Sequence, residues 1–197
     1  MDVSEFGCDF LAISGHKMCG PTGIGALYGR REILEAMPPW HGGGEMITSV
    51  TLEKSSYKKP PHRFEAGTPN IAGAIGLAAA IDYIEGIGRA TIFEHDSRLT
   101  EYALARFDDL KGVRVLGPTG KRGAIISFVF ESAHPHDVTT FADRAGLALR
   151  GGHHCNQPLM RKFKVPGTAR ASFYFYNTEV EIDRMIEILS DAVKFFE

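Results

Sequence analysis

The first candidate for chemistry is a lysine within FLAISGHKMCGPTGIG, residues 10–25. Lys17 follows an apolar run and lies in a turn with Ser14, His16 and several glycines. Hydroxyl and imidazole groups can hold an oxyanion, and glycines let a bulky ligand approach the backbone. The combination suits a lysine that forms a Schiff base with a phosphate-bearing cofactor. The alternative is a solvated lysine in a surface turn, which residue type alone favours.

The second candidate is a cysteine within LRGGHHCNQPL, residues 149–159. Cys155 follows two histidines and two glycines, with Arg150 upstream. An electropositive, polar loop favours the reactive thiolate, whereas the alternative is a small buried cysteine beside surface histidines. We expect no metal site here, because the contiguous His153, His154 and Cys155 are poorly placed to ligate one zinc ion and no second ligand pair has the usual spacing.

Two further stretches carry groups that bind anions. Arg170 lies in the apolar run ARASFYFY, where it either clamps a substrate carboxylate or extends into water from an edge strand. In RFEAGTPN, Gly67 and Thr68 precede Pro69 and a predicted helix start, and they offer a backbone amide and a hydroxyl to an anion.

The other glycine-rich stretches are predicted to be turns. GPTGIG at residues 20–25 reverses the order of a dinucleotide-binding fingerprint. GPTGKRG at residues 117–123 lacks the spacing of a phosphate-binding loop and has Arg122 where that loop has serine or threonine.

Composition limits the protein class without naming a partner. The chain has 197 residues, 44% of them hydrophobic, which is enough to bury a core. Its formal net charge is -2 and its basic residues are scattered, so we expect no nucleic-acid partner. No apolar run is long enough to cross a bilayer, so we expect no membrane partner. The three cysteines are an odd number with spacings unlike those of a disulfide framework, so we expect a reducing compartment, the cytoplasm.

The chemistry-bearing residues must be positioned by two groups of elements. Apolar patterns and turn signals predict, in the first group, strands at 9–14 and 24–30, a short helix at 31–37, a long irregular connection at 40–70 and a helix rich in Gly and Ala at 71–88. They predict, in the second group, a helix at 90–110, strands at 113–117, 123–130, 147–150 and 169–176, a helix closed by Gly146, and a final helix with Thr178 and Glu181 as a capping box.

Several motifs together resemble one enzyme family. SGHKMCGPTGIGALY, MPPWHGGGEMI, RFEAGTPN, RGGHHCNQPLM and RASFYFYNT occur in the order found in SufS-type (group II) cysteine desulfurases and selenocysteine lyases, which belong to the class V aminotransferases. The resemblance implies an α/β fold, the C-terminal part of a fold type I transferase that depends on pyridoxal 5'-phosphate (PLP). It implies that residues 1–89 end the large PLP-binding domain, with its active-site loop, and that residues 90–197 form the small α+β domain.

The resemblance also implies roles for individual residues. Lys17 would form the Schiff base with PLP, Ser14 and His16 would contact its phosphate, and Gly67 and Thr68 would reach the phosphate in the other subunit of a homodimer. Arg170 would hold the substrate carboxylate beside Arg150. The thiolate of Cys155 would attack the sulfur of L-cysteine, which leaves alanine and a persulfide for a sulfur-acceptor protein, as in Fe–S cluster assembly. L-Selenocysteine is the other substrate that the resemblance implies.

The chain departs from this family in length. Members are about twice as long, and their N-terminal half carries the histidine that stacks on PLP, the aspartate that pairs with its pyridine nitrogen, and a phosphate-binding loop. We therefore expect this chain to need a missing N-terminal half or a complementary chain. The alternative is a catalytically incomplete fragment or a sulfur-carrying subunit that binds no PLP of its own.

Overall fold

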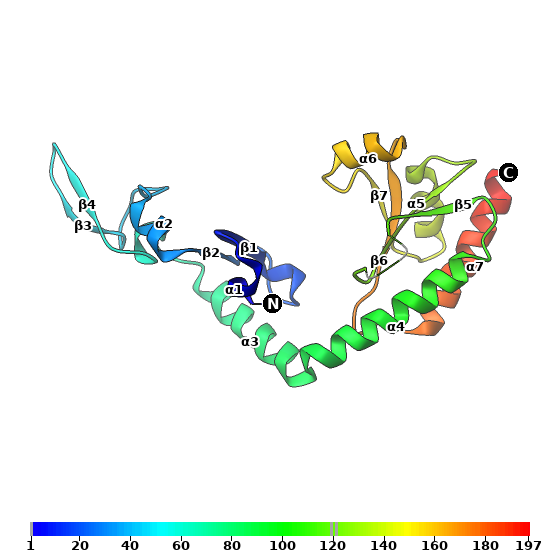
Figure 1. Cartoon of the computed structure of the whole chain (residues 1–197), viewed down its shortest axis with the longest axis horizontal. Helices are drawn as coiled ribbons and strands as arrows, with labels where there is room; N and C mark the ends of the chain where they lie inside the picture. The colour runs from blue at the N-terminus through cyan, green and yellow to red at the C-terminus, as the bar shows by residue number, and fades with distance from the viewer. Residues whose placement is uncertain (1, 119, 121) are drawn as a thin grey trace. The chain divides into compact units, whose positions relative to one another are not determined.

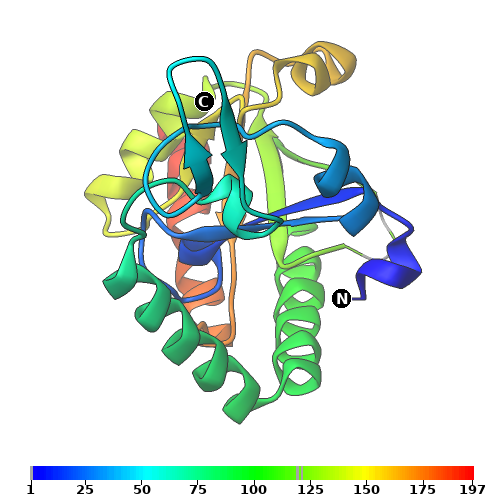
Figure 2. The ribbon, with the colours of Figure 1, turned by 90° about the vertical axis from the view of Figure 1, so that its left-hand side faces the viewer.

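The computed structural model describes residues 2–118, 120 and 122–197. It divides into two compact units, Met1–Ile87 and Gly88–Glu197, which are called the first and second units below (Figures 1 and 2). The stretch at 117–123, predicted to be a turn, contains residues 119 and 121, which lie outside the described part of the chain.

The first unit places a short antiparallel pair of strands before a long helix. β1 (Phe10–Ser14) pairs with β2 (Gly25–Gly29), as the sequence predicts, with Ser14 opposite Gly25. The remaining helices are α1 (Val3–Phe6), α2 (Arg31–Ala36) and α3 (Ile71–Ile87). Among the described strands, β1 pairs only with β2, and Phe10 on it is 42% exposed.

The connection at 40–70 is more regular than predicted. It contains the antiparallel hairpin of β3 (Ile47–Val50) and β4 (Ser55–Tyr57), followed by a 3-10 turn, η2 (His62–Phe64). The side chains of Thr48 and Ser56 share a hydrogen bond of 2.8 Å across the hairpin. Sequence periodicity missed the hairpin because its strands are three or four residues long and largely polar.

The second unit is built on a four-stranded antiparallel sheet in the order β5-β6-β8-β7. The strands are β5 (Val113–Leu116), β6 (Ile125–Phe130), β7 (Arg150–Gly152) and β8 (Thr168–Ser172). The helices are α4 (Arg89–Phe107), α5 (Pro135–Arg144), α6 (Gln157–Phe163) and α7 (Glu179–Phe196). This sheet covered by helices positions the cysteine loop, which follows β7 (Figure 1).

The core of the second unit lies where α4, α5 and α7 meet the sheet. Leu99, Phe128, Val138 and Leu189 are fully buried and belong to one hydrophobic cluster. The predicted capping box of α7 is present, because the Thr178 hydroxyl accepts from the Glu181 amide and the Glu181 carboxylate accepts from the Thr178 amide. These local and long-range features agree on one fold for this unit.

Two predicted strands of the second unit are shifted, and one helix was missed. The strand expected at 147–150 begins only at Arg150, and the one expected at 169–176 begins at Thr168 and ends at Ser172. Helix α6, capped by Asn156, was not predicted. Within the described part of the chain, no single helix is long and apolar enough to cross a membrane, and only α3 and α4 taken together across their break meet that test.

Candidate active site

The lysine turn of the first unit is held by backbone hydrogen bonds. Lys17 ends η1 (Gly15–Lys17), a single 3-10 turn that follows β1 directly. The Gly15 carbonyl accepts from the amides of Met18 and Gly20, at 2.9 and 3.0 Å, and the Gly15 amide donates to the Ile24 carbonyl at 2.9 Å. The chain therefore leaves β1, turns once at the lysine and returns as β2.

Helix α3 packs closely against this turn, in agreement with its small-residue sequence. A Cβ atom at Gly76 would lie 2.7 Å from Cγ of Pro21, so a larger residue would push the helix away from the turn. The Leu77 side chain contacts the same turn, since it would be 3.3 Å from a Cβ atom at Gly15. The helix thus fixes the backbone beside Lys17 while the lysine side chain remains exposed.

The groups around Lys17 suit an electrophilic, anionic ligand. Among the described residues, its amine has no hydrogen-bond or ion-pair partner. His16 is exposed and Ser14 is half-buried, so a hydroxyl and an imidazole lie in the same turn as the amine. A primary amine, a hydroxyl and an imidazole are donors that fit an aldehyde with a phosphate, as PLP is.

The second predicted anion turn lies in the same unit. Gly67 has φ of 80°, and its amide donates to the Gly44 carbonyl at 3.0 Å. Thr68 is exposed. Two residues later, the Asn70 side chain donates to the Gly23 carbonyl at 3.2 Å, which ties this segment to the lysine turn. The Gly67 amide, predicted to be open to an anion, is thus used within the chain, whereas Thr68 is exposed.

The cysteine loop of the second unit has an unusual backbone. Gly152, His154 and Cys155 have φ of 122°, 53° and 60°, values that residues other than glycine rarely adopt. The Asn156 side chain then accepts from the Leu159 amide and begins α6. Two consecutive left-handed residues bend the chain sharply and leave Cys155 exposed, so the alternative of a buried structural cysteine does not hold.

Cys155 opens into a polar pocket of about 550 Å³, lined by Arg150, Gly151, His153, His154, Cys155, Gln157 and Pro158. The Sγ atom lies 3.8 Å from Nη2 of Arg150. A guanidinium beside a sulfur can stabilise negative charge that develops on it during a reaction. The pocket thus combines an accessible sulfur with a fixed positive charge.

The two predicted arginines face each other across neighbouring strands. Arg150 of β7 is the register partner of Arg170 of β8, so their Cβ atoms lie on one face of the sheet. Because β8 lies between β6 and β7, Arg170 is not on an edge strand. Its Nε atom is buried and has no hydrogen-bond partner among the described residues. Two like charges and an unsatisfied donor are features of an anion-binding site.

His154 forms its hydrogen bonds with Thr168. Its Nε2 atom lies 2.7 Å from the Thr168 hydroxyl and 3.1 Å from the Thr168 carbonyl. Burial lowers the pKa of His154 below its ordinary value, and the charges of Arg170 and Arg150 lower it further, while the hydrogen bond to Thr168 opposes the shift. The imidazole therefore does not supply positive charge to Cys155, and Arg150 does.

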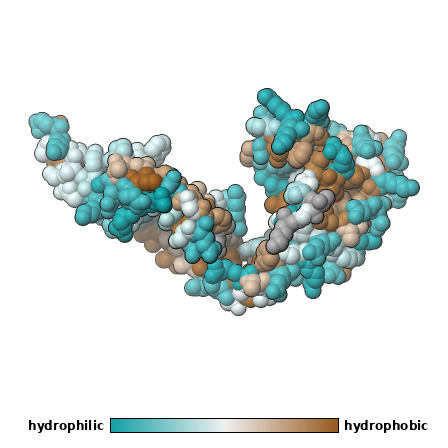
Figure 3. Space-filling model, viewed as in Figure 1, coloured by the Kyte–Doolittle hydropathy of each residue, from teal (hydrophilic) through white to brown (hydrophobic). Residues whose placement is uncertain are grey.

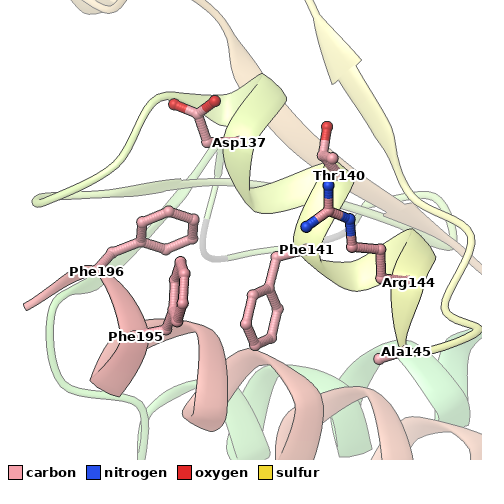
Figure 4. Close-up of a pocket in the computed structure, with 7 residues that line it drawn as sticks. All are labelled: Asp137, Thr140, Phe141, Arg144, Ala145, Phe195 and Phe196. Carbon is pink, nitrogen blue, oxygen red and sulfur yellow. The ribbon is translucent and has the colours of Figure 1, made fainter.

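A separate pocket of about 430 Å³ lies between α5 and α7 (Figure 4). The rings of Phe141, Phe195 and Phe196 gather in it, with centroids 5.0 to 6.1 Å apart. None of the predicted site residues lines it. No group of three potential metal ligands exists among the described residues, and the three cysteines are unpaired.

The structure therefore gathers Arg150, Arg170 and Cys155 in the second unit, and Lys17 and Thr68 in the first. Sequence reasoning missed Thr168, which is 1% exposed and contacts His154. A threonine followed two residues later by Arg170 has no local signal of its own, because its partner is 14 residues away. It could have been found only from the strand pairing.

Comparisons with known proteins give the same family as the motifs. The family model Aminotransferase class-V matches residues 1–185. Probable cysteine desulfurases of Streptomyces coelicolor and Halalkalibacterium halodurans are 50% and 53% identical over 100% of this chain, which covers 47% and 48% of their lengths. The chain thus spans about half the length of these curated relatives.

Solved structures of cysteine desulfurases have the same fold over this range. An apo cysteine desulfurase of Thermococcus onnurineus is 42% identical with a TM-score of 0.93, and 98% of this chain covers 48% of it. An Escherichia coli cysteine desulfurase with an S-sulfonic acid is 38% identical with a TM-score of 0.94, and 100% of this chain covers 49% of it. The chain therefore belongs to the class V aminotransferase family and has part of the fold type I architecture of its PLP-dependent members.

Proposed function

We propose that this chain is the C-terminal half of a SufS-type cysteine desulfurase, which converts L-cysteine to L-alanine and stores the sulfur as a persulfide on Cys155. The observation that carries the proposal is the exposed Cys155 sulfur 3.8 Å from Arg150, whose strand partner Arg170 has an unsatisfied buried donor. The names of the relatives at about 50% identity support it.

The residues of the first unit would hold PLP. The amine of Lys17 would bind the cofactor, and Ser14 and His16 would contact its phosphate. Thr68, which follows the turn at Gly67, would contact the phosphate bound by a second copy of the chain in a homodimer. PLP, when bound, withdraws electrons from the substrate's Cα. Once the amine of the substrate replaces it on the cofactor, the free amine of Lys17 would move the proton of that carbon, and it has no other partner among the described residues.

The residues of the second unit would hold the amino acid and take its sulfur. Arg170 and Arg150 would clamp the substrate carboxylate. The Cys155 thiolate would attack the substrate sulfur, so that an S–S bond forms while the C–S bond breaks and its electron pair returns to carbon. Protonation of that carbon completes alanine. Cysteine plus the Cys155 thiol thus gives alanine plus the Cys155 persulfide, with no added oxidant or reductant.

An apolar helix of the first unit also indicates a partner that contributes the rest of the fold. Helix α3 is apolar on most sides, yet Ile71, Ile75 and Ile81 are 58%, 67% and 41% exposed, and brown, hydrophobic residues are visible along this region in Figure 3. A helix that is apolar all round is normally buried. We propose that the missing N-terminal half, or a complementary chain, covers it.

The same proposal covers the substrate, the sulfur acceptor and the cellular compartment. The substrate is L-cysteine or L-selenocysteine, and a sulfur-acceptor protein takes the persulfide sulfur, for uses such as Fe–S cluster assembly. Three unpaired cysteines suit a reducing compartment such as the cytoplasm. The large-domain role of residues 1–89 and the small-domain role of residues 90–197 are part of the same assignment.

Reconstitution separates this enzyme from a sulfur carrier without PLP. The chain is purified alone and together with the N-terminal half of the Halalkalibacterium halodurans relative, and PLP absorbance and alanine release from cysteine are measured for both. We expect both signals only in the pair, and Lys17→Ala should remove them. Absence of PLP absorbance in a stable, well-folded pair would favour the sulfur-carrying alternative.

A further inference from the structure

A buried contact links the cysteine loop to the middle of the sheet. Thr168 is the first residue of β8 and the register partner of Gly152, the last residue of β7. Its side chain is 1% exposed, and its hydroxyl and carbonyl both face Nε2 of His154, at 2.7 and 3.1 Å. His154 immediately precedes the proposed nucleophile. Thr168 therefore contacts the loop through both its hydroxyl and its carbonyl.

The geometry determines which nitrogen of His154 carries the proton. A carbonyl oxygen only accepts, so the Nε2 atom that faces it must be the donor. Nδ1 is then unprotonated, and this atom is buried without a partner among the described residues. A second proton at Nδ1 would have no acceptor there and would lie in the field of Arg170. The imidazole is thus a neutral donor that points at Thr168.

The loop needs such a contact because its backbone is costly. His154 and Cys155 both lie in the left-handed region, with φ of 53° and 60°. A residue other than glycine in that region costs of order 1 to 3 kcal/mol, and it persists only where the surroundings hold it. Within the loop, the Asn156 amide donates to the His153 carbonyl at 2.9 Å, while the His153 side chain is exposed and makes one long hydrogen bond of 3.4 Å to Gln157. The contact with Thr168 ties the left-handed pair to the sheet.

We propose that Thr168 is a positioning residue of the desulfurase, which holds the Cys155 loop in its left-handed conformation by accepting a hydrogen bond from Nε2 of His154. This inference rests on the proposed role of Cys155. The clamp keeps the sulfur beside Nη2 of Arg150 and keeps the imidazole from competing with Arg170 for an anion. His154 acts through its hydrogen bond and takes no part in proton transfer.

Thiol alkylation of the full chain tests the proposal with an internal reference. Iodoacetamide labelling at pH 7 is followed by peptide mapping, and the rate at Cys155 is divided by the rate at Cys19, which is exposed in the other unit. Thr168→Val keeps the volume and the backbone carbonyl at 3.1 Å but removes the nearer acceptor, the hydroxyl at 2.7 Å. It should lower this ratio about two- to tenfold, the factor that one lost hydrogen bond supplies. Thr168→Ser keeps the hydroxyl and should restore the ratio.

A second pair of variants keeps the test decisive if Thr168→Val fails to fold. His154→Gln retains a neutral donor and should stay near the wild-type ratio, whereas His154→Ala should lower it. Hydrogen exchange of the amides at 153–156 should accelerate in His154→Ala but not in His154→Gln. Nitrogen chemical shifts of His154 in the wild-type chain should show Nε2 protonated and Nδ1 unprotonated.

The outcomes separate this inference from the proposed function. An unchanged or higher ratio in Thr168→Val and His154→Ala, with unchanged exchange at 153–156, would overturn the clamp. Equal loss in His154→Gln and His154→Ala would also overturn it, because the imidazole itself would then be required. Slow labelling of Cys155 in the wild-type chain, with the exchange differences present, would retain the clamp and count against Cys155 as the nucleophile.

Discussion

Replacing Arg150 should raise the stability of the second unit and lower the rate at which Cys155 reacts. Arg150 and Arg170 are register partners, and opposed Cβ atoms of antiparallel strands lie about 5 Å apart. The guanidinium charges lie beyond these Cβ atoms, and in water they would repel by about 0.8 kcal/mol if they too were about 5 Å apart, a value that salt reduces. Because Arg150 is exposed, we expect Arg150→Gln to raise the free energy of unfolding by up to about 0.8 kcal/mol at low salt and by less at high salt.

The same change removes the cation 3.8 Å from the Cys155 sulfur, so alkylation of Cys155 at pH 7 should slow while that of Cys19 does not change. Urea unfolding at low and high salt gives the stability, and peptide mapping gives the labelling rates. Arg114→Gln is a matched control, because Arg114 is an exposed arginine of the same sheet whose register partner is Val129. A loss of stability in Arg150→Gln, together with unchanged labelling of Cys155, would refute this reasoning.

Three further predictions concern the core, pH and the cofactor. Phe128→Ala should cost about 3 to 5 kcal/mol in urea unfolding, because Phe128 is fully buried, whereas Ile125→Ala at a 47% exposed position of the same strand should cost much less. The pKa of His154 is lowered in the folded chain, so the stability that neutral His154 contributes is present above the ordinary pKa of 6.5 and is lost as pH falls below it. Urea unfolding between pH 7.5 and 5.5 should show this loss of stability, and His154→Gln should reduce it. The chain alone should lose PLP on dialysis, as absorbance will show, because losing two or three charge-assisted contacts of about 1.5 to 3 kcal/mol each weakens binding by orders of magnitude; PLP retained at one equivalent would contradict this.

The sequence predicted the elements whose signals are local. Helix α7 has apolar residues on one face and a complete capping box at Thr178 and Glu181, so its existence and its start are both confirmed. The residues of β5 and β6 are rich in Val, Ile and Phe, and both strands are confirmed. Such elements are specified by the residues within them.

One strand that the sequence placed wrongly depends on a distant partner. β7 is Arg-Gly-Gly, which has no strand propensity, and it forms because it pairs with β8. β1 is apolar as an interior strand is, but the described chain gives it only β2 as a neighbour. The site residues Lys17, Cys155 and Arg170 could be chosen from the sequence by their chemistry, whereas Thr168 could not.

The most direct test of the desulfurase proposal is the mass of the peptide that contains Cys155. The chain is paired with the complementary half, loaded with PLP and given L-cysteine without an acceptor, and the peptides are analysed under non-reducing conditions. The proposal predicts one added sulfur atom on Cys155, with alanine formed in equal amount, and neither product in Lys17→Ala. Sustained alanine release with no added sulfur on Cys155, and undiminished release in Cys155→Ala, would contradict it.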